Sequence, residues 1–177
     1  RFVFANGKWC EMGVKLEETG LEWVVIDLLE SVPALPVSAP EGYVIDWPNK
    51  AHEVLQDIAG QDWKGLFIAF DYGLDSPTIF MERPQGTGRT YSNHKMGSDL
   101  LERPGQIDIT CHVVWDFMEQ ILRNNRFTDI RLLRQESFFM QFAQSEIQAI
   151  LENSPTGFSY EKQSLMELIH PGNMGHQ

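Results

Sequence analysis

A helical pattern followed at once by a continuous apolar run is the feature that most restricts how this chain can fold. Apolar residues recur with the 3.6-residue period of a helix between positions 49 and 60, and Gly60 ends the pattern. Leu66 to Phe70 is then apolar without interruption, and Asp71-Tyr72-Gly73 follows. Such a run is typical of a strand buried on both faces of a parallel sheet, which carries polar residues to a ligand crevice at its carboxyl end. The sequence therefore predicts an α/β fold.

The residues before this region predict antiparallel β structure. Asn6-Gly7 separates apolar-rich runs at 2–5 and 9–14, and this dipeptide favours a tight hairpin because both of its residues adopt positive φ. A third strand is expected over 22–29 and a short strand over 43–46. A proline-rich connection separates these last two strands.

The later part of the chain mixes strand and helix patterns. The expected elements are a hairpin with strands 78–81 and 87–91, a polar loop over 92–105, a helix over 114–122, a strand over 127–133, and helices to the end, the last over 159–169. We expect two regions in all. Residues 1–42 form an antiparallel β excursion with its proline-rich connection, and residues 43–177 form the α/β part.

The charge balance argues against binding to nucleic acid. The chain of 177 residues has 14 Lys and Arg against 25 Asp and Glu, a net charge of −11, whereas duplex binding depends on cations that neutralise phosphates. No apolar run approaches the roughly 20 residues that a membrane span needs. Two cysteines are too few for a disulfide framework and favour a reducing compartment. We expect no nucleic-acid partner and no membrane partner.

The common catalytic motifs are absent from the sequence, including the phosphate-binding loop, the hydrolase nucleophile elbow and the zinc-protease helix. Gly86-Thr87-Gly88 is an isolated pair of glycines, which is typical of a turn. Cys111 and His112 are neighbours, so on a strand they would point to opposite faces, and the other histidines lack ligand spacing. We expect no metal site and a buried, structural thiol at Cys111.

Three polar clusters remain as candidate sites. Asp71-Tyr72-Gly73 follows the predicted buried strand, where it could serve a ligand crevice or where Asp71 could cap a turn. Residues 86–91, with His94 after them, concentrate hydrogen-bond donors on a hairpin, although composition alone favours an ordinary solvated hairpin. Residues 105–113 alternate so that Asp108, Thr110 and His112 share one face of a strand. Alternatively, Asp108 or Thr110 caps the next helix.

The same clusters carry a resemblance to a known family. Phe70-Asp71-Tyr72-Gly73, then residues 83–91 with His94, then Pro104 to Val113 resemble the ordered landmarks of the MidA family. Gln135 with Phe138-Phe139 and the pair Met174-Gly175 resemble its later segments. The family consists of S-adenosyl-L-methionine-dependent methyltransferases and includes the mitochondrial methyltransferase of complex I assembly.

The resemblance implies a class I, Rossmann-like methyltransferase sheet with helices on both faces, here partial, with inserted antiparallel hairpins and a helical C-terminal region. Leu66 to Phe70 would be its fifth strand and 127–133 its sixth. The implied cofactor is S-adenosyl-L-methionine. The family's glycine-rich loop and the acidic residue after its second strand are not found in these residues, so the cofactor-binding residues are unknown. We expect the chain to be an internal or C-terminal piece of a larger methyltransferase.

The resemblance also suggests roles for the polar residues. Methyl transfer mainly requires alignment of the acceptor with the methyl group, and an arginine acceptor needs carboxylates to orient it and to accept a proton. We expect Asp71, Asp108 and His112 to be the catalytic groups on the acceptor side. The expected substrate-binding residues are Tyr72, Gly73, Arg89, Tyr91, His94 and Thr110, of which Tyr72 and Thr110 orient the catalytic groups and Arg89 supports the loop or binds a substrate carboxylate.

Two further expectations concern partners and place. The alternative to an enzyme is a catalytically incomplete module that binds proteins during complex assembly. A sheet cut between strands would leave an open edge, so self-association or pairing with a complementing chain is also expected. The family implies a bacterial cytoplasmic location, with the mitochondrial matrix as the alternative.

Overall fold

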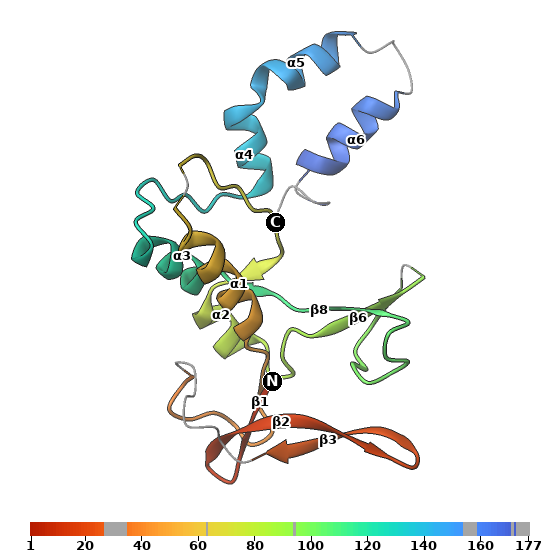
Figure 1. Ribbon diagram of the computed structural model, residues 1–177. Coiled ribbons are helices and arrows are strands. Elements are labelled where there is room, and N and C mark those ends of the chain that lie inside the picture. Colours follow the sequence, from red (N-terminus) through yellow and green to blue (C-terminus); the bar gives the residue numbers. More distant parts are fainter. Residues whose placement is uncertain (27–34, 63, 94, 154–158, 171, 173–177) are drawn as a thin grey trace. The chain divides into compact units, whose positions relative to one another are not determined.

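The computed structural model describes residues 1–26, 35–62, 64–93, 95–153, 159–170 and 172 (Figure 1). The chain divides into two compact units, which are described separately. The first comprises Arg1–Trp63 and Gly73–Phe127, and the second comprises Lys64–Tyr72 and Thr128–Gln177. Within the described ranges, no helix has the length and apolar character needed to cross a membrane.

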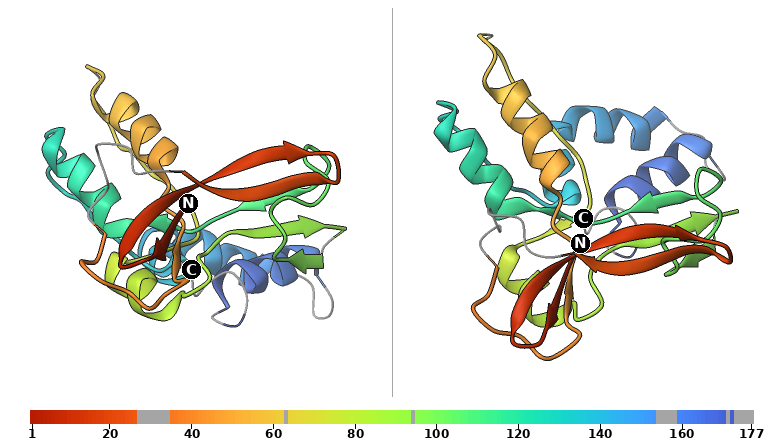
Figure 2. Two further views of the ribbon diagram at one scale, coloured as in Figure 1. Left: turned by 90° about the horizontal axis from the view of Figure 1, so that it is seen from below. Right: turned by 60° about the horizontal axis from the view of Figure 1, so that its bottom comes forward.

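An antiparallel sheet with the order β3-β2-β1-β4 opens the first unit. Its strands are β1 (Phe2–Ala5), β2 (Lys8–Glu17), β3 (Gly20–Ile26) and β4 (Val44–Ile45). The long β2–β3 ribbon is visible in Figure 2. Asn6 and Gly7 have φ values of 53° and 76°, as a type I′ turn requires. The predicted hairpin and short fourth strand are confirmed, and the predicted third strand is confirmed as far as Ile26; positions 27–29 lie outside the described residues.

Three helices and a short parallel strand pair form the α/β part of this unit. The elements are α1 (Asn49–Ala59), β5 (Gly73–Leu74), α2 (Ser76–Glu82), β9 (Val113–Val114) and α3 (Trp115–Asn124). β5 runs parallel to β9 and places Gly73 beside Val113. The helices expected before Gly60 and over 114–122 are therefore confirmed as α1 and α3.

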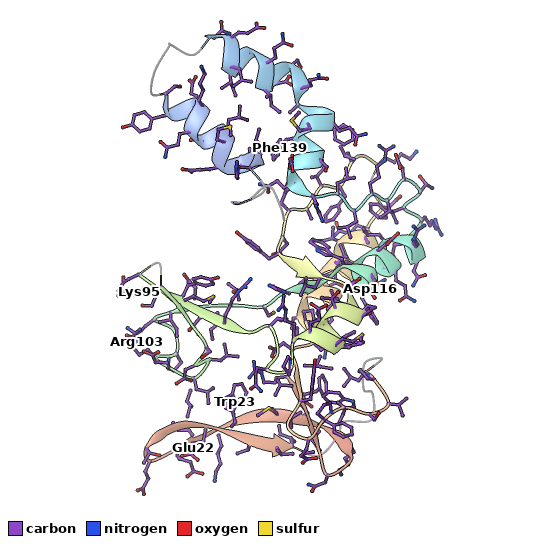
Figure 3. The ribbon with its side chains drawn as sticks, turned by 180° about the vertical axis from the view of Figure 1, so that it is seen from behind. Glu22, Trp23, Lys95, Arg103, Asp116 and Phe139 are labelled. Carbon is purple, nitrogen blue, oxygen red and sulfur yellow. The ribbon has the colours of Figure 1, made fainter. Side chains whose placement is uncertain are left out.

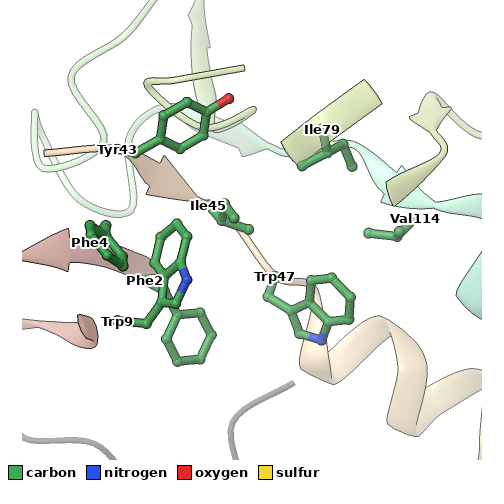
Figure 4. Packing of buried hydrophobic residues seen from close by; sticks show 8 residues of the cluster. All are labelled: Phe2, Phe4, Trp9, Tyr43, Ile45, Trp47, Ile79 and Val114. Carbon is green, nitrogen blue, oxygen red and sulfur yellow. The ribbon is translucent and has the colours of Figure 1, made fainter. Parts of the chain in front are cut away.

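A small apolar core joins these elements to the antiparallel sheet (Figure 4). Its buried members come from β1, β2, the β4 segment, α2 and β9 and are Phe2, Phe4, Trp9, Tyr43, Ile45, Trp47, Ile79 and Val114. Full burial of one large apolar side chain contributes about 1.5–3 kcal/mol. Ile45 and Val114 are fully buried, so packing fixes β4 and β9, the two strands that flank the candidate site described below.

A second antiparallel sheet follows α2, with the order β7-β6-β8. Its strands are β6 (Arg89–Ser92), β7 (Lys95–Gly97) and β8 (Asp108–Thr110). The strand expected over 87–91 is confirmed in its second half. The strand expected within 105–113 is confirmed as β8, so the side chains of Asp108 and Thr110 do share a face.

The second unit is mainly helical, as the sequence predicts. It contains α4 (Gln135–Phe142), α5 (Gln144–Asn153) and α6 (Tyr160–Ile169). Gln135 Nε2 donates to the carbonyl of Leu168 at 2.9 Å and ties α4 to α6. Phe70 packs on Phe138 and Phe139 with ring centroids 5.1 Å and 5.8 Å apart; Phe139 is labelled in Figure 3.

Two predicted strands are wrong. Residues 66–70 and 127–133 are extended or irregular, and none of the described strands pairs with either segment. Leu66 is 83% exposed and Phe70 53%, which is far from the two-sided burial that the apolar run predicts. An apolar run becomes a strand only where a neighbouring strand satisfies its N–H and C=O groups.

The predicted second hairpin and loop also need correction. Residues 78–81 lie in α2, because Asp75 accepts a hydrogen bond from the backbone N–H of Thr78 at 3.0 Å and so caps the helix. Pro77 in the first helical turn fits this start. The expected loop over 92–105 contains β7, which pairs with β6. Cys111, expected to be buried, is exposed.

Candidate functional site

Four of the residues singled out in the sequence lie on one face of the β6–β8 strand pair. The register sets Arg89 opposite Thr110 and Tyr91 opposite Asp108, and directly opposed residues of an antiparallel pair point to the same side. Asp108 and Thr110 are exposed, and Arg89 and Tyr91 are half-buried. The structure therefore brings a carboxylate, a hydroxyl, a phenol and a guanidinium together on one surface.

His112 joins this face through Arg89. Nη2 of Arg89 lies 2.9 Å from Nε2 of His112, and Nε of Arg89 donates to Thr110 Oγ1 at 3.4 Å. A guanidinium has only donors, so Nε2 is the acceptor in this contact. A hydrogen bond of this kind corresponds to the tautomer that carries its proton on Nδ1. We call these five residues, Arg89, Tyr91, Asp108, Thr110 and His112, the polar face.

The loop that leads into β6 is held by a buried carboxylate, Asp46, directly after β4. Its Oδ2 accepts hydrogen bonds from the backbone N–H groups of Thr87 at 2.8 Å and Gly88 at 2.7 Å. Arg1 donates to the same carboxylate through Nε at 2.7 Å and Nη2 at 3.0 Å. Burial acts to raise the pKa of Asp46, but the hydrogen bonds from Arg1, Gly88 and Thr87 together hold it below the ordinary value. Asp46 is therefore ionised near neutral pH.

Thr87 connects this loop to the polar face. The backbone N–H of His112 donates to Thr87 Oγ1 at 3.2 Å. The loop thus touches the histidine from one side, while Arg89, two residues further along the chain, touches its ring. Glycine is required at position 86, where φ is +79° and an added methyl group would lie 2.2 Å from Asp46 Oδ2.

The remaining candidate residues are placed differently. Gly73 lies on β5 beside Val113, and a methyl group added there would come within 2.4 Å of Trp115 Nε1, so close packing explains a glycine at this position. Asp71 and Tyr72 belong to the second unit, where Asp71 Oδ1 accepts a hydrogen bond from the backbone N–H of Tyr72 at 2.7 Å. The substrate-binding prediction for His94 falls on a residue outside those that the structure describes.

A separate hollow of about 310 Å³ occupies the opposite face of the same sheet. Thr90 and Gly97, which pair across β6 and β7, line it together with Ser92, Lys95, Arg103 and Ile107 among others. Lys95 and Arg103 are labelled in Figure 3. Because neighbouring residues on a strand point to opposite sides, Thr90 turns away from the side chains of Arg89 and Tyr91.

One residue of the site, Asp46, is missing from the sequence-based candidates. A single acid between the apolar residues Ile45 and Trp47 nevertheless indicates a buried carboxylate that needs partners. In the part of the chain that the structure describes, no group of three His, Cys, Asp or Glu side chains could hold a metal ion.

Comparison with known proteins shows which family the sequence matches. Residues 1–131 match a family model described as "Putative S-adenosyl-L-methionine-dependent methyltransferase". Comparison with curated protein sequences finds no match.

The chain also resembles two crystal structures from Burkholderia thailandensis, each at 20% sequence identity with a TM-score of 0.81 over 98% of this chain. One is a native structure of an uncharacterized protein; the other protein is described as a "likely methyl transferase" and is bound to S-adenosyl-homocysteine. The chain spans 48% and 46% of those two chains, about half their length. The likeness establishes an α/β fold shared with these structures.

Proposed function

Because the chain belongs to a family of S-adenosyl-L-methionine-dependent methyltransferases, we propose that the protein carrying it methylates an arginine side chain of a protein substrate. The family supports methyl transfer as the reaction. The arginine acceptor is supported by the resemblance of the polar clusters to the MidA family and by the chemistry of the polar face. The narrower MidA identification, its link to complex I assembly and a Rossmann-like sheet in the whole protein belong to the same proposal.

The described residues do not fit a complete cofactor site. Open α/β sheets of the Rossmann type bind nucleotide-like groups at a glycine-rich turn between a strand and a helix. None of the strand-to-helix connections in the described residues has such a turn. β5 leads to α2 through Asp75, and β9 passes directly into α3. S-adenosyl-L-methionine is the family's methyl donor, and we assign to this chain only functions on the acceptor side.

Asp108 is the acceptor-side carboxylate in this proposal. It stands on β8 opposite Tyr91 and is exposed, so an arginine that enters from solvent can reach it. Carboxylates pair with guanidinium groups through two parallel hydrogen bonds, which fixes the plane of the group. Asp108 thus orients the nucleophilic nitrogen and accepts the proton that this nitrogen loses.

Arg89 supports His112, which keeps its expected place among the catalytic groups on the acceptor side. Arg89 contacts Thr110 and His112, which favours the loop-supporting role among the two that the sequence suggested for it. The ring of His112 is oriented by the contact of its Nε2 with Arg89. Asp71 and Tyr72 stay in the proposal as predictions from the sequence.

One observation carries the proposal: the β6–β8 register gathers Asp108, Thr110, Arg89 and Tyr91 on one surface, in contact with His112. The test uses the intact enzyme, S-adenosyl-L-methionine and a library of arginine-containing peptides, with methylated arginine read by mass spectrometry. Asp108→Asn is expected to lower turnover about 100-fold and to leave the affinity for S-adenosyl-homocysteine unchanged.

Two controls define the outcome. Asp57→Asn changes an exposed acid on α1 and is expected to leave turnover unchanged. A second library with lysine in place of arginine is expected to remain unmethylated. Unchanged turnover in Asp108→Asn, or methylation of the lysine library, would contradict the proposal.

The incomplete cofactor site favours a second candidate, a catalytically incomplete module that binds proteins during assembly. Calorimetric titration of the 177-residue chain with S-adenosyl-L-methionine separates the two candidates. Tight binding would show that these residues form the cofactor site after all. An intact protein that binds neither the donor nor its product would support the binding module.

A further inference from the structure

The carboxylate of Asp46 links three segments that are far apart in the sequence. It follows β4, its side chain is 11% exposed, and it accepts hydrogen bonds from Arg1, Thr87 and Gly88. An ionised carboxylate that accepts backbone N–H groups forms stronger hydrogen bonds than a neutral acceptor does. The backbone of the loop is thus fixed at the two residues directly before Arg89.

The fixed loop bears on the polar face at two points. Thr87 Oγ1 receives the backbone N–H of His112, and Arg89 places Nη2 against Nε2 of the same residue. His112 is therefore held by one residue of the loop and by the first residue of β6. Any shift of the loop moves both contacts together.

We infer that Asp46 is a positioning residue that sets the geometry of Arg89 and His112 by holding the backbone of Thr87 and Gly88. The inference rests on the proposed function, in which these two residues support the acceptor. Asp46 itself faces the loop and Arg1, and none of its hydrogen bonds involves a residue of the polar face. A misplacement of about 1 Å in supporting groups can reduce turnover about 100-fold.

Arg1 holds the carboxylate in the required orientation. Its guanidinium donates to both oxygens of Asp46 and lies over the ring of Trp23 with 5.1 Å between the guanidinium carbon and the ring centroid; Trp23 is labelled in Figure 3. The guanidinium of Arg1 is therefore fixed between Trp23 on β3 and the carboxylate of Asp46.

Asp46→Asn is the sharpest variant because it keeps the volume and changes only the charge and one acceptor. An asparagine has one acceptor oxygen, and its NH₂ group would face donors. The intact enzyme is assayed with the arginine peptide library and S-adenosyl-L-methionine. We expect turnover to fall about tenfold or more, with unchanged affinity for S-adenosyl-homocysteine. Ile45→Val, which alters the same strand without touching the loop, is the matched control and is expected to keep turnover.

A double-mutant cycle separates positioning from a general loss of stability. If Asp46 acts through Arg89 and His112, then the loss of turnover in Asp46→Asn combined with Arg89→Leu is smaller than the product of the two single losses. A double variant whose loss of turnover equals the product of the two single losses would overturn the inference. Arg1→Gln, which keeps the carboxylate, serves as a milder second variant if Asp46→Asn does not fold, and the same non-additivity is expected.

Nuclear magnetic resonance supplies a readout besides activity. Asp46→Asn is expected to shift the amide proton signals of Thr87, Gly88 and His112, whereas Ile45→Val leaves them in place. Unchanged His112 signals would overturn the inference even if turnover falls. If Arg89→Leu alone leaves methyl transfer intact, the proposed acceptor site fails, and the amide signals still decide whether Asp46 positions His112.

Discussion

Nη2 of Arg89 lies 2.9 Å from Nε2 of His112, although the two residues are 23 positions apart in the sequence. The contact requires a neutral imidazole, because a guanidinium can only donate. It also connects β6 to the segment between β8 and β9. A histidine held in this way is oriented before an acceptor arrives.

Loss of this contact should impair catalysis more than folding. Arg89→Leu is expected to lower the turnover of an arginine peptide about tenfold or more, because the His112 ring loses the donor that fixes it. Arg131→Leu is the control, since Arg131 pairs with Asp129 in an exposed ion pair, a kind that contributes little to stability. Equal turnover in the two variants would show that the Arg89–His112 contact is incidental.

Gly86→Ala should destabilise the loop that Asp46 holds. An alanine at φ +79° costs about 1–2 kcal/mol, and its methyl group would in addition lie 2.2 Å from Asp46 Oδ2. Gly105→Ala is a matched control, with φ of +77° and nothing within 4 Å of the added carbon. In urea denaturation, the free energy of unfolding should fall further for Gly86→Ala than for Gly105→Ala. Equal losses of unfolding free energy would mean that the Asp46 carboxylate moves aside without measurable cost.

The α2–α3 contact should depend on Asp116, which is labelled in Figure 3. Its carboxylate accepts from the backbone N–H of buried Ser76 at 2.9 Å and from the Ser76 hydroxyl at 2.5 Å. Asp116→Ala leaves both donors without this acceptor, which should lower the free energy of unfolding by about 1–3 kcal/mol. Glu119→Ala on the same helix removes only an exposed ion pair with Arg123 and should cost less than about 1 kcal/mol. A larger loss of unfolding free energy for Glu119→Ala than for Asp116→Ala in urea denaturation would show that the Asp116–Ser76 contact does not stabilise the fold.

Stability should fall as the pH drops through the range where His52 would titrate in the unfolded chain. His52 packs against Trp47 and Phe117, and burial lowers its pKa below the ordinary 6.5, with Asp116 acting in the opposite direction. The unfolded chain then binds the proton more readily than the folded one. The stabilisation is therefore complete above pH 6.5 and is lost progressively below it.

A substitution isolates this effect. His52→Phe should flatten the dependence of the free energy of unfolding on pH between about pH 8 and pH 5. The contribution of Asp46 appears only in more acidic solution, because its pKa lies below 3.8. An unchanged slope in His52→Phe would mean that another group causes the pH dependence.

Local patterns in the sequence predicted those elements whose stability is mainly local. The Asn6-Gly7 turn, the helix ending before Gly60 and the helices after residue 134 all appear. The period-2 alternation around Asp108 predicted a shared face for Asp108, Thr110 and His112, which the structure confirms for Asp108 and Thr110 on β8. The turn chemistry, periodicity and strand alternation that specify such elements lie within a few neighbouring residues.

The patterns failed where structure depends on distant partners. The apolar run 66–70 has the composition of a buried strand, yet no described strand pairs with it. Residues 78–81 failed for a local reason instead: they have strand-like composition, but the neighbouring Asp75 cap and Pro77 make them helical. Composition does not specify which backbone groups a segment will meet.

The sequence by itself determined the α/β class, the N-terminal hairpin and the identity of the polar residues on β6 and β8. Only the tertiary structure decided that Arg89 contacts His112. It also decided that Asp46 holds the loop before β6 by accepting hydrogen bonds from Thr87 and Gly88, which are more than 40 positions away in the sequence. The reason is physical. A turn or a helical period is specified by adjacent residues, whereas a hydrogen bond between remote residues forms only after packing of the core has brought β4 and β9 into place.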